Sequence, residues 1–324
     1  MIDVQSRART TRRAIGRRSS VLLTAAMAVG AFTSQASAAH AADDVPANSS
    51  STTSGGALGD TVFGRSGKLR VRILGGSQSG SIALPILQRY FGDSAVNTPG
   101  VYELPEEAAG GRPFSLITLL PFSDKDRGAV GGYRVGFWPA ERRTPRTGAY
   151  QNPEGFIRVT EENQSTYVSE HFQLRDFLTK DQRDVWPKYL VLRLDLIDKL
   201  ELIIDELQSR GVRVSHLSVM SGFRTPQYNQ LGVGKGGRAK DSRHQFGDAA
   251  DVFVDNNRDG RMDDLNHDGR VDTRDAQIII EAAERVERRF PDLVGGAGRY
   301  RANRVHGPFA HIDVRGYRAR WSNA

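Results

Sequence analysis

The stretch SRHQFGDAADV, residues 242–252, places His244 seven residues before Asp251, with Gly247 between them. We expect a strand to begin near Ala249 and to present Asp251. The turn at Gly247 then folds His244 back toward the same point, so that an imidazole and a carboxylate can share one metal ion.

Two further stretches indicate the same chemistry. SGFRTPQYN, residues 221–229, follows a strand predicted in VRVSHLSVM, residues 212–220, and HGPFAHIDVRGYRARW, residues 306–321, places His311 on a final strand, FAHIDV. The chain has no cysteine, which excludes disulfides, thiolate zinc sites, iron–sulfur clusters and cysteine nucleophiles. A catalytic zinc site needs about three nitrogen or oxygen ligands and one open position. This set is supplied by His244, Asp251 and His311.

The segments around these ligands predict an α+β fold. Apolar residues recur every three or four positions from Leu192 to Arg210, and Gly211 follows, which predicts a helix that ends there. A second helix is predicted from Thr273 to Phe290. The C-terminal half is therefore expected to be a small antiparallel sheet with flanking helices.

The preceding part of the chain looks β-rich. From about Lys68 to Thr160, short β-prone runs alternate with Gly and Pro. Residues 81–91 (SIALPILQRYF) predict a helix broken by Pro85, and residues 171–178 (HFQLRDFL) predict a short amphipathic helix. The β-rich part carries no ligand set, so a binding or packing module and a plain scaffold both stay open.

The first 41 residues are typical of an export signal. An apolar run from Val21 to Phe32 and two A-x-A cleavage sites follow six basic residues: Arg7, Arg9, Arg12, Arg13, Arg17 and Arg18. A retained anchor is the alternative, and the pair Arg12-Arg13 leaves open general secretory or twin-arginine export. The leader holds six Arg and one Asp, so its removal lowers the net charge from +7 to +2. The basic excess therefore does not indicate nucleic-acid binding.

Four ranges follow from these patterns. We predict a signal peptide at 1–41, a flexible linker rich in Ser, Thr and Gly at 42–67, a β-rich accessory domain at 68–165, and a metal-binding domain at 166–324 with an acidic insert at 255–275. No membrane span is expected after signal cleavage, and the chain is expected outside the cytoplasmic membrane.

The acidic insert has the spacing of calcium loops. Oxygen-bearing side chains at alternate positions, with Gly at the turn, are what Ca²⁺ requires. Two overlapping loops fit and resemble dockerin or thrombospondin-type calcium repeats. Their candidate ligands are Asp255, Asn257, Asp259, Asp263 and Asn266 in one loop, and Asp264, Asn266, Asp268, Asp272 and Asp275 in the other. The alternative is an acidic, solvated loop neutralised by Arg258, Arg261, Arg270 and Arg274.

Taken together, the three stretches resemble zinc peptidoglycan peptidases related to D-Ala-D-Ala carboxypeptidases, especially the branch with a C-terminal F-x-H-[IV]-D-x-G-x-x-R-x-W block. The resemblance covers about residues 171–321, and the family pattern S-x-H-x-x-G-x-A-x-D falls on Ser242 to Asp251. It implies that His244, Asp251 and His311 bind zinc. It also implies that Arg224 binds the peptide carboxylate or polarises the scissile carbonyl.

One position departs from the pattern of many relatives. They carry a catalytic Asp or Glu three residues before the last zinc histidine, and this chain has Pro308 there. His306 is our preferred replacement as acid/base or oxyanion stabiliser. Asp313 is the other candidate, although a strand places it on the face of His311, where it can instead orient the imidazole.

The sequence thus predicts an exported zinc metallopeptidase, periplasmic or associated with the cell wall. Its substrates would be peptidoglycan stem peptides or cross-links, cleaved as a D,D- or L,D-carboxypeptidase or endopeptidase, and calcium would stabilise it. A non-catalytic wall-binding protein with structural zinc and calcium remains as an alternative, as does a zinc peptidase acting on other peptides.

Overall fold

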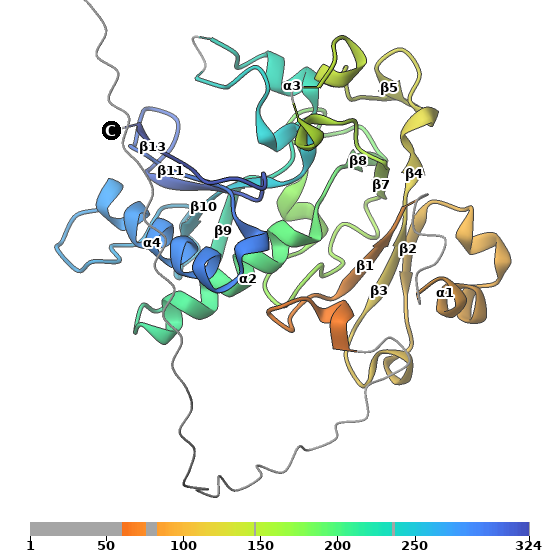
Figure 1. Ribbon diagram of the computed structural model, residues 1–324, viewed down its shortest axis with the longest axis horizontal. Coiled ribbons are helices and arrows are strands. Elements are labelled where there is room, and N and C mark those ends of the chain that lie inside the picture. Colours follow the sequence, from red (N-terminus) through yellow and green to blue (C-terminus); the bar gives the residue numbers. More distant parts are fainter. Residues whose placement is uncertain (1–59, 76–82, 146, 235–236, 324) are drawn as a thin grey trace, which may run out of the picture. The chain divides into compact units, whose positions relative to one another are not determined.

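A five-stranded sheet carries the C-terminal half of the chain (Figure 1). Its strand order is β13-β11-β12-β10-β9. The strands are β9 (Leu217–Ser221), β10 (Ala249–Val254), β11 (Gly296–Tyr300), β12 (Phe309–Asp313) and β13 (Ala319–Asn323). Four of them pair antiparallel, as expected, whereas β13 pairs with β11 in parallel, so the sheet is mixed.

The computed structural model describes residues 60–75, 83–145, 147–234 and 237–323. All of these belong to one compact unit, Thr52–Ala324. The predicted signal peptide and most of the predicted linker lie outside the described residues. Within them, no helix is long and apolar enough to cross a membrane.

Two long helices pack together and against the sheet (Figure 1). The helix α2 (Leu194–Ser209) and the helix α4 (Thr273–Arg289) confirm the two helices predicted from apolar periodicity. Gly211, with φ of +80°, lies just beyond α2, as a glycine in the left-handed region should. Helix α4 contacts both β11 and β12, so the helices support the strand that carries His311.

The N-terminal part contains several short strands, as predicted. One three-stranded sheet, in the order β1-β3-β2, contains β1 (Val71–Leu74), β2 (Gly100–Glu103) and β3 (Ser115–Thr118). Another, in the order β4-β7-β8, contains β4 (Leu120–Pro121), β7 (Gly155–Val159) and β8 (Lys188–Leu190). The described residues also form a hairpin of β5 (Ala129–Val130) and β6 (Tyr133–Arg134) and a short helix α3 (Pro226–Gln230). These elements, with the C-terminal sheet and helices, make a mixed α and β protein.

Two local expectations were wrong. Pro85 does not break the helix α1 (Ala83–Phe91), because it lies in the first turn, where its missing N–H leaves no helical bond unmade. The amphipathic helix expected from His171 is a single 3₁₀ turn, Leu174–Phe177, at which the Asp176 carboxylate accepts a hydrogen bond from the Gln173 amide.

The main hydrophobic core runs across the boundary expected at residue 165. Strand β7 pairs with β8, with Ile157 opposite Leu190, and both side chains are buried. The same core includes Val71 of β1 and Ile312 of β12. A smaller core surrounds α1, where Leu87 and Leu116 are fully buried. The strands of the β-rich range therefore share packing with the sheet that carries the candidate ligands.

Candidate metal centre

One row of residues crosses all five strands of the C-terminal sheet. Ser221 of β9 lies opposite Asp251 of β10, which lies opposite His311 of β12. His311 in turn lies opposite Gly298 of β11, which lies opposite Trp321 of β13. Directly paired residues point to the same face of a sheet. The register therefore places the Asp251 carboxylate beside the His311 imidazole at the centre of one face.

His244 reaches this face from a 3₁₀ turn, Arg243–Phe246, that precedes β10. Gly247 follows with φ of +67°, and a side chain there would clash with the carbonyl oxygen of Val191. The turn is fixed by a buried ion pair between Arg243 and Asp248. The predicted strand start at Ala249 and the predicted turn at Gly247 are both confirmed.

The three ligand atoms have the spacing of a tetrahedral zinc site. His244 Nε2 lies 3.2 Å from His311 Nδ1 and 3.3 Å from Asp251 Oδ1, and His311 Nδ1 lies 3.0 Å from Asp251 Oδ1. Zinc–nitrogen bonds of about 2.0–2.1 Å at tetrahedral angles place neighbouring ligand atoms about 3.3 Å apart. All three side chains are buried. The group is thus compatible with zinc, with two nitrogen donors and one oxygen donor.

Both imidazoles have a partner on the side away from the centre. His244 Nδ1 donates to the carbonyl oxygen of Gly222 at 2.7 Å, and His311 Nε2 donates to Asp313 Oδ2 at 3.1 Å. When both rings are neutral, these bonds leave the lone pairs of His244 Nε2 and His311 Nδ1 directed at the centre. Asp313 therefore has the orienting position that alternation along the strand predicts.

The ionisation of the group also suits a metal. Burial would raise the pKa of Asp251, but His244, His311 and Arg224 hold it well below its usual value. Burial and the Arg224 charge lower the pKa of His244 to about 4. Burial would also lower the pKa of His311, but hydrogen bonds to Asp251 and Asp313 raise it to about 8. At neutral pH the carboxylate is ionised and His244 is neutral, while His311 would have to give up a proton for a cation to bind.

Arg224 borders the centre and is tied to it. Its Nη2 forms an ion pair with Asp251 Oδ2, its Nε donates to Ser221 Oγ at 2.8 Å, and its backbone amide donates to the His244 carbonyl. The side chain is 14% exposed. Arg224 thus holds the carboxylate in place, and its predicted contact with a peptide stays a prediction.

His306 lies in the loop before β12 and is partly exposed. Its Nε2 lies 2.7 Å from the Asn303 amide nitrogen, and its Nδ1 lies 2.8 Å from the Gly307 carbonyl oxygen. In the described part of the chain no hydrogen bond or ion pair joins His306 to His244, Asp251 or His311. Its predicted catalytic role therefore stays a prediction.

Trp321, an aromatic residue that was not predicted to belong to the site, lies beside the centre. The Trp321 indole lies across Gly298, where any side chain would clash with it, and its ring centroid lies 5.2 Å from that of His311. Its Nε1 donates to the Tyr300 hydroxyl at 2.8 Å. The signal in the sequence is the small-residue run GGAG, residues 295–298, just before Tyr300.

The acidic insert forms two turns of the same shape, nine residues apart. Asp255 and Asp264 each accept hydrogen bonds from the amides four and five residues later, and Gly260 and Gly269 have φ near +80°. In the second turn Arg274 forms ion pairs with Asp268 and Asp272. Among the described residues, the His, Asp and Glu side chains that lie close enough together to hold a metal are His244, Asp251 and His311, and none of these belongs to the insert. The two turns are therefore not assigned as calcium sites on geometry.

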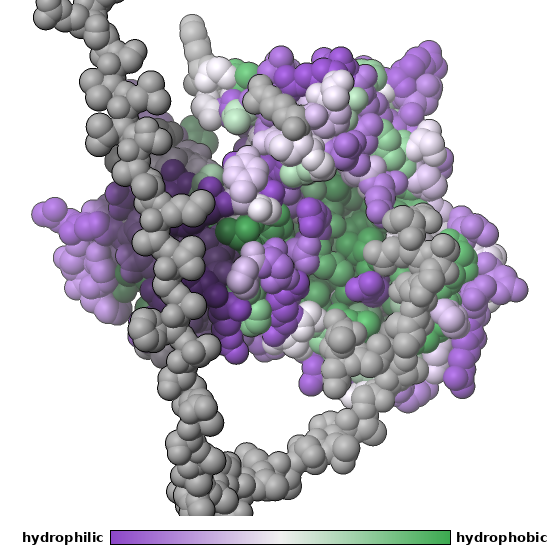
Figure 2. Space-filling model, in the orientation of Figure 1, coloured by the Kyte–Doolittle hydropathy of each residue, from purple (hydrophilic) through white to green (hydrophobic). Residues whose placement is uncertain are grey.

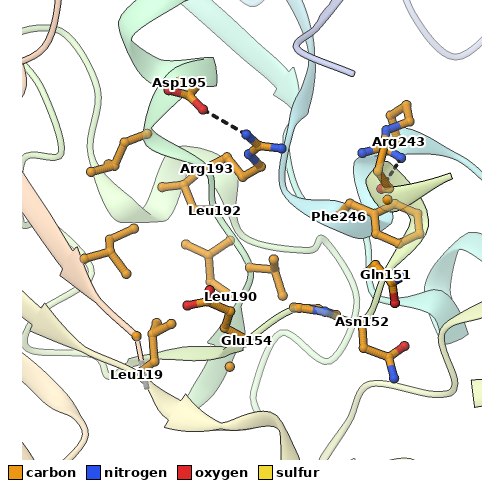
Figure 3. A pocket seen from close by; sticks show the side chains of 18 of the residues that line it. Leu119, Gln151, Asn152, Glu154, Leu190, Leu192, Arg193, Asp195, Arg243 and Phe246 are labelled. Carbon is orange, nitrogen blue, oxygen red and sulfur yellow. Dashed lines mark hydrogen bonds and ion pairs between the residues drawn. The ribbon is translucent and has the colours of Figure 1, made fainter. Parts of the chain in front are cut away.

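A separate pocket of about 540 Å³ lies beside the turn that carries His244 (Figure 3). Leu119, Leu190 and Leu192 contribute an apolar floor, and the ion pair of Arg193 with Asp195 lies at its edge. Figure 2 shows apolar surface in the middle of the face in view, among polar residues. The three candidate ligands do not line this pocket.

Comparison of the chain with protein-family models, with curated proteins and with solved structures gives no match. The assignment of function therefore rests on the metal centre and on the sequence motifs around it.

Proposed function

We propose that the protein is an exported zinc metallopeptidase that hydrolyses peptide bonds in peptidoglycan stem peptides or cross-links. The observation that carries the proposal is the buried group of His244, Asp251 and His311, whose ligand atoms lie 3.0–3.3 Å apart. The substrate class is supported by the three motifs, which occur in the order found in zinc peptidoglycan peptidases.

The residues of the centre would have separate roles in such an enzyme. His244, Asp251 and His311 would hold zinc, which supplies Lewis-acid activation of the scissile carbonyl and of the attacking water. Asp313 fixes the orientation of His311, and Arg224 fixes that of Asp251. Arg224 also brings a positive charge to the edge of the centre, where a substrate oxygen would develop negative charge.

We further propose that the acidic insert binds calcium and stabilises the domain. The support is the repeated pattern D-x-N-x-D-G-x-x-D at 255–263 and 264–272, which folds into the same turn twice. In the second turn the ion would replace Arg274 as the partner of Asp268 and Asp272. Export to the periplasm or the cell wall is proposed from the leader sequence alone.

A second candidate is a non-catalytic wall-binding protein that keeps the metal as a structural element. It is favoured by Pro308 at the position of the usual acid, and by the two hydrogen bonds that occupy the ring nitrogens of His306.

The test is incubation of purified muropeptides with the zinc-loaded protein, read by mass spectrometry. The variant His244→Ala should give no product, and His216→Ala, which removes an imidazole outside the centre, should cleave like the wild type. The mass of the product identifies the bond and separates a carboxypeptidase from an endopeptidase. Binding of muropeptides without any cleavage by the wild type would favour the second candidate.

A further inference from the structure

The Tyr300 side chain stands on the same face of the sheet as the metal ligands. Gly298 lies directly opposite His311, and Tyr300 is two residues further along the same strand. Its ring stacks on Phe309, with centroids 4.6 Å apart and planes 4° from parallel. Because residues two apart on a strand share a face, the phenol extends over the surface that holds His311.

Trp321 fixes the direction of the Tyr300 hydroxyl. The indole reaches its position because Gly298 has no side chain, and it packs beside the His311 ring. Its Nε1 donates to the Tyr300 oxygen, so that oxygen acts as an acceptor toward Trp321. The hydroxyl proton must then point elsewhere, and among the described residues it has no acceptor. Donation into the phenol oxygen also polarises the O–H bond and makes it a stronger donor.

Two catalytic candidates that the sequence offers, Asp313 and His306, are already engaged. The Asp313 carboxylate accepts from His311, from the Gly296 amide and from Arg315. The two ring nitrogens of His306 are taken by Asn303 and Gly307. Burial raises the pKa of Tyr300, with a smaller contribution from the Asp251 charge, so the phenol keeps its proton at neutral pH.

We propose that the Tyr300 hydroxyl donates a hydrogen bond to the oxyanion that develops on the substrate carbonyl. This inference rests on the proposed peptidase function. No proton is transferred in this role, so the phenol is unchanged over the reaction, and Trp321 acts as a positioning residue for it.

The variant Tyr300→Phe tests the role, because it keeps the ring stack on Phe309 and removes only the hydroxyl. Three quantities are measured: the zinc dissociation constant, the dissociation constant of a phosphinic-acid muropeptide analogue, and kcat/KM for the muropeptide. We expect unchanged zinc affinity, and a loss of about 10- to 100-fold in both analogue affinity and kcat/KM, as for loss of one hydrogen bond to a charged group. Tyr167→Phe, which removes an exposed phenol elsewhere, should match the wild type.

Trp321→Phe keeps a ring beside His311 and removes the indole N–H. It should weaken analogue binding less than Tyr300→Phe does, and the double variant should bind no worse than Tyr300→Phe alone. Equal analogue binding by the wild type and Tyr300→Phe would overturn the role of Tyr300 while leaving the peptidase intact. Failure of the wild type to bind the analogue and to cleave would remove the peptidase function, and this inference with it.

Discussion

Replacement of Asp313 by asparagine should weaken zinc binding without disturbing the shape of the centre. The Asp313 side chain is fully buried, and its carboxylate accepts hydrogen bonds from His311 Nε2, from the Gly296 amide at 2.7 Å and from Arg315 Nε. Every partner is a donor. An asparagine therefore directs its NH₂ group at one of them, and only the His311 ring can adapt, by moving its proton to Nδ1. The proton then occupies the nitrogen that should bind the metal.

The size of the effect follows from the role of this contact. Loss of a partner that orients a metal-binding histidine typically costs about 10- to 100-fold in metal affinity. At a free zinc concentration 100 times the wild-type dissociation constant, zinc would stabilise the wild type by about 2.7 kcal/mol. A 100-fold weaker variant at the same zinc concentration would gain only about 0.4 kcal/mol. The thermal shift on adding zinc should therefore almost disappear.

The measurement is competition for zinc against a chromophoric chelator, combined with thermal unfolding with and without zinc. Asp205→Asn is the matched control, because Asp205 is a partly exposed carboxylate paired with Lys68. If Asp313→Asn bound zinc within about threefold of the wild type, the His311 tautomer would not depend on Asp313, and the assignment of Nδ1 as the ligand atom would be wrong.

Three further outcomes are expected. Gly247→Ala should cost about 3 kcal/mol in urea unfolding because of its positive φ and the clash with Val191, whereas Gly211→Ala, at a similar φ with open space around it, should cost only about 1 kcal/mol. Millimolar calcium should raise the unfolding temperature relative to EGTA, and equal temperatures would remove calcium from the proposal. A hydrogen bond from His171 to Glu201, at 2.7 Å, raises the pKa of His171. This pair therefore stabilises the fold fully below about pH 6.5, and its contribution falls as the pH rises through the raised pKa. The difference in unfolding temperature between the wild type and His171→Gln should therefore shrink from pH 6 to pH 9, and a constant difference would contradict the assignment.

The local features of the metal centre could be predicted from the sequence because short-range chemistry decides them. Apolar periodicity located the helices α2 and α4, and glycine in a tight turn before a β-prone run located Gly247 and the start of β10. Alternation along β12 placed Asp313 on the side of His311. Each of these depends on residues that lie close together in the sequence.

Features that depend on distant parts of the chain were not predictable. The parallel pairing of β13 with β11 brings Trp321 across Gly298, and no local pattern specifies that partner. The shared core of β7 and β8 depends on pairing across the expected domain boundary. The sequence shows that His306 lies five residues before a candidate ligand. The hydrogen bond between its ring and Asn303 depends on the shape of the loop, which the sequence does not show.

Helix α2 shows how the far side of the sheet supports the centre. Its polar residues Asp198, Lys199 and Glu201 are buried, although apolar periodicity alone would place polar positions at the surface. Lys199 Nζ donates to the Asp313 carbonyl oxygen and to Glu287 of α4, both at 2.8 Å. Glu287 also pairs with Arg320 of β13, so one buried network ties two helices to the strands that carry His311 and Trp321.

A variant in this network tests whether the Asp313 carboxylate or the backbone position of β12 sets the geometry of His311. Lys199→Met removes a buried charge from a pair, which should cost about 3–5 kcal/mol of stability, but it leaves the Asp313 carboxylate and its contact with His311 in place. Zinc affinity should then stay within about threefold of the wild type, in contrast to Asp313→Asn. If Lys199→Met weakened zinc binding as much as Asp313→Asn does, the backbone position of β12 and not the carboxylate would set the geometry of the ligand. The helices would then be part of the metal centre and not only its support.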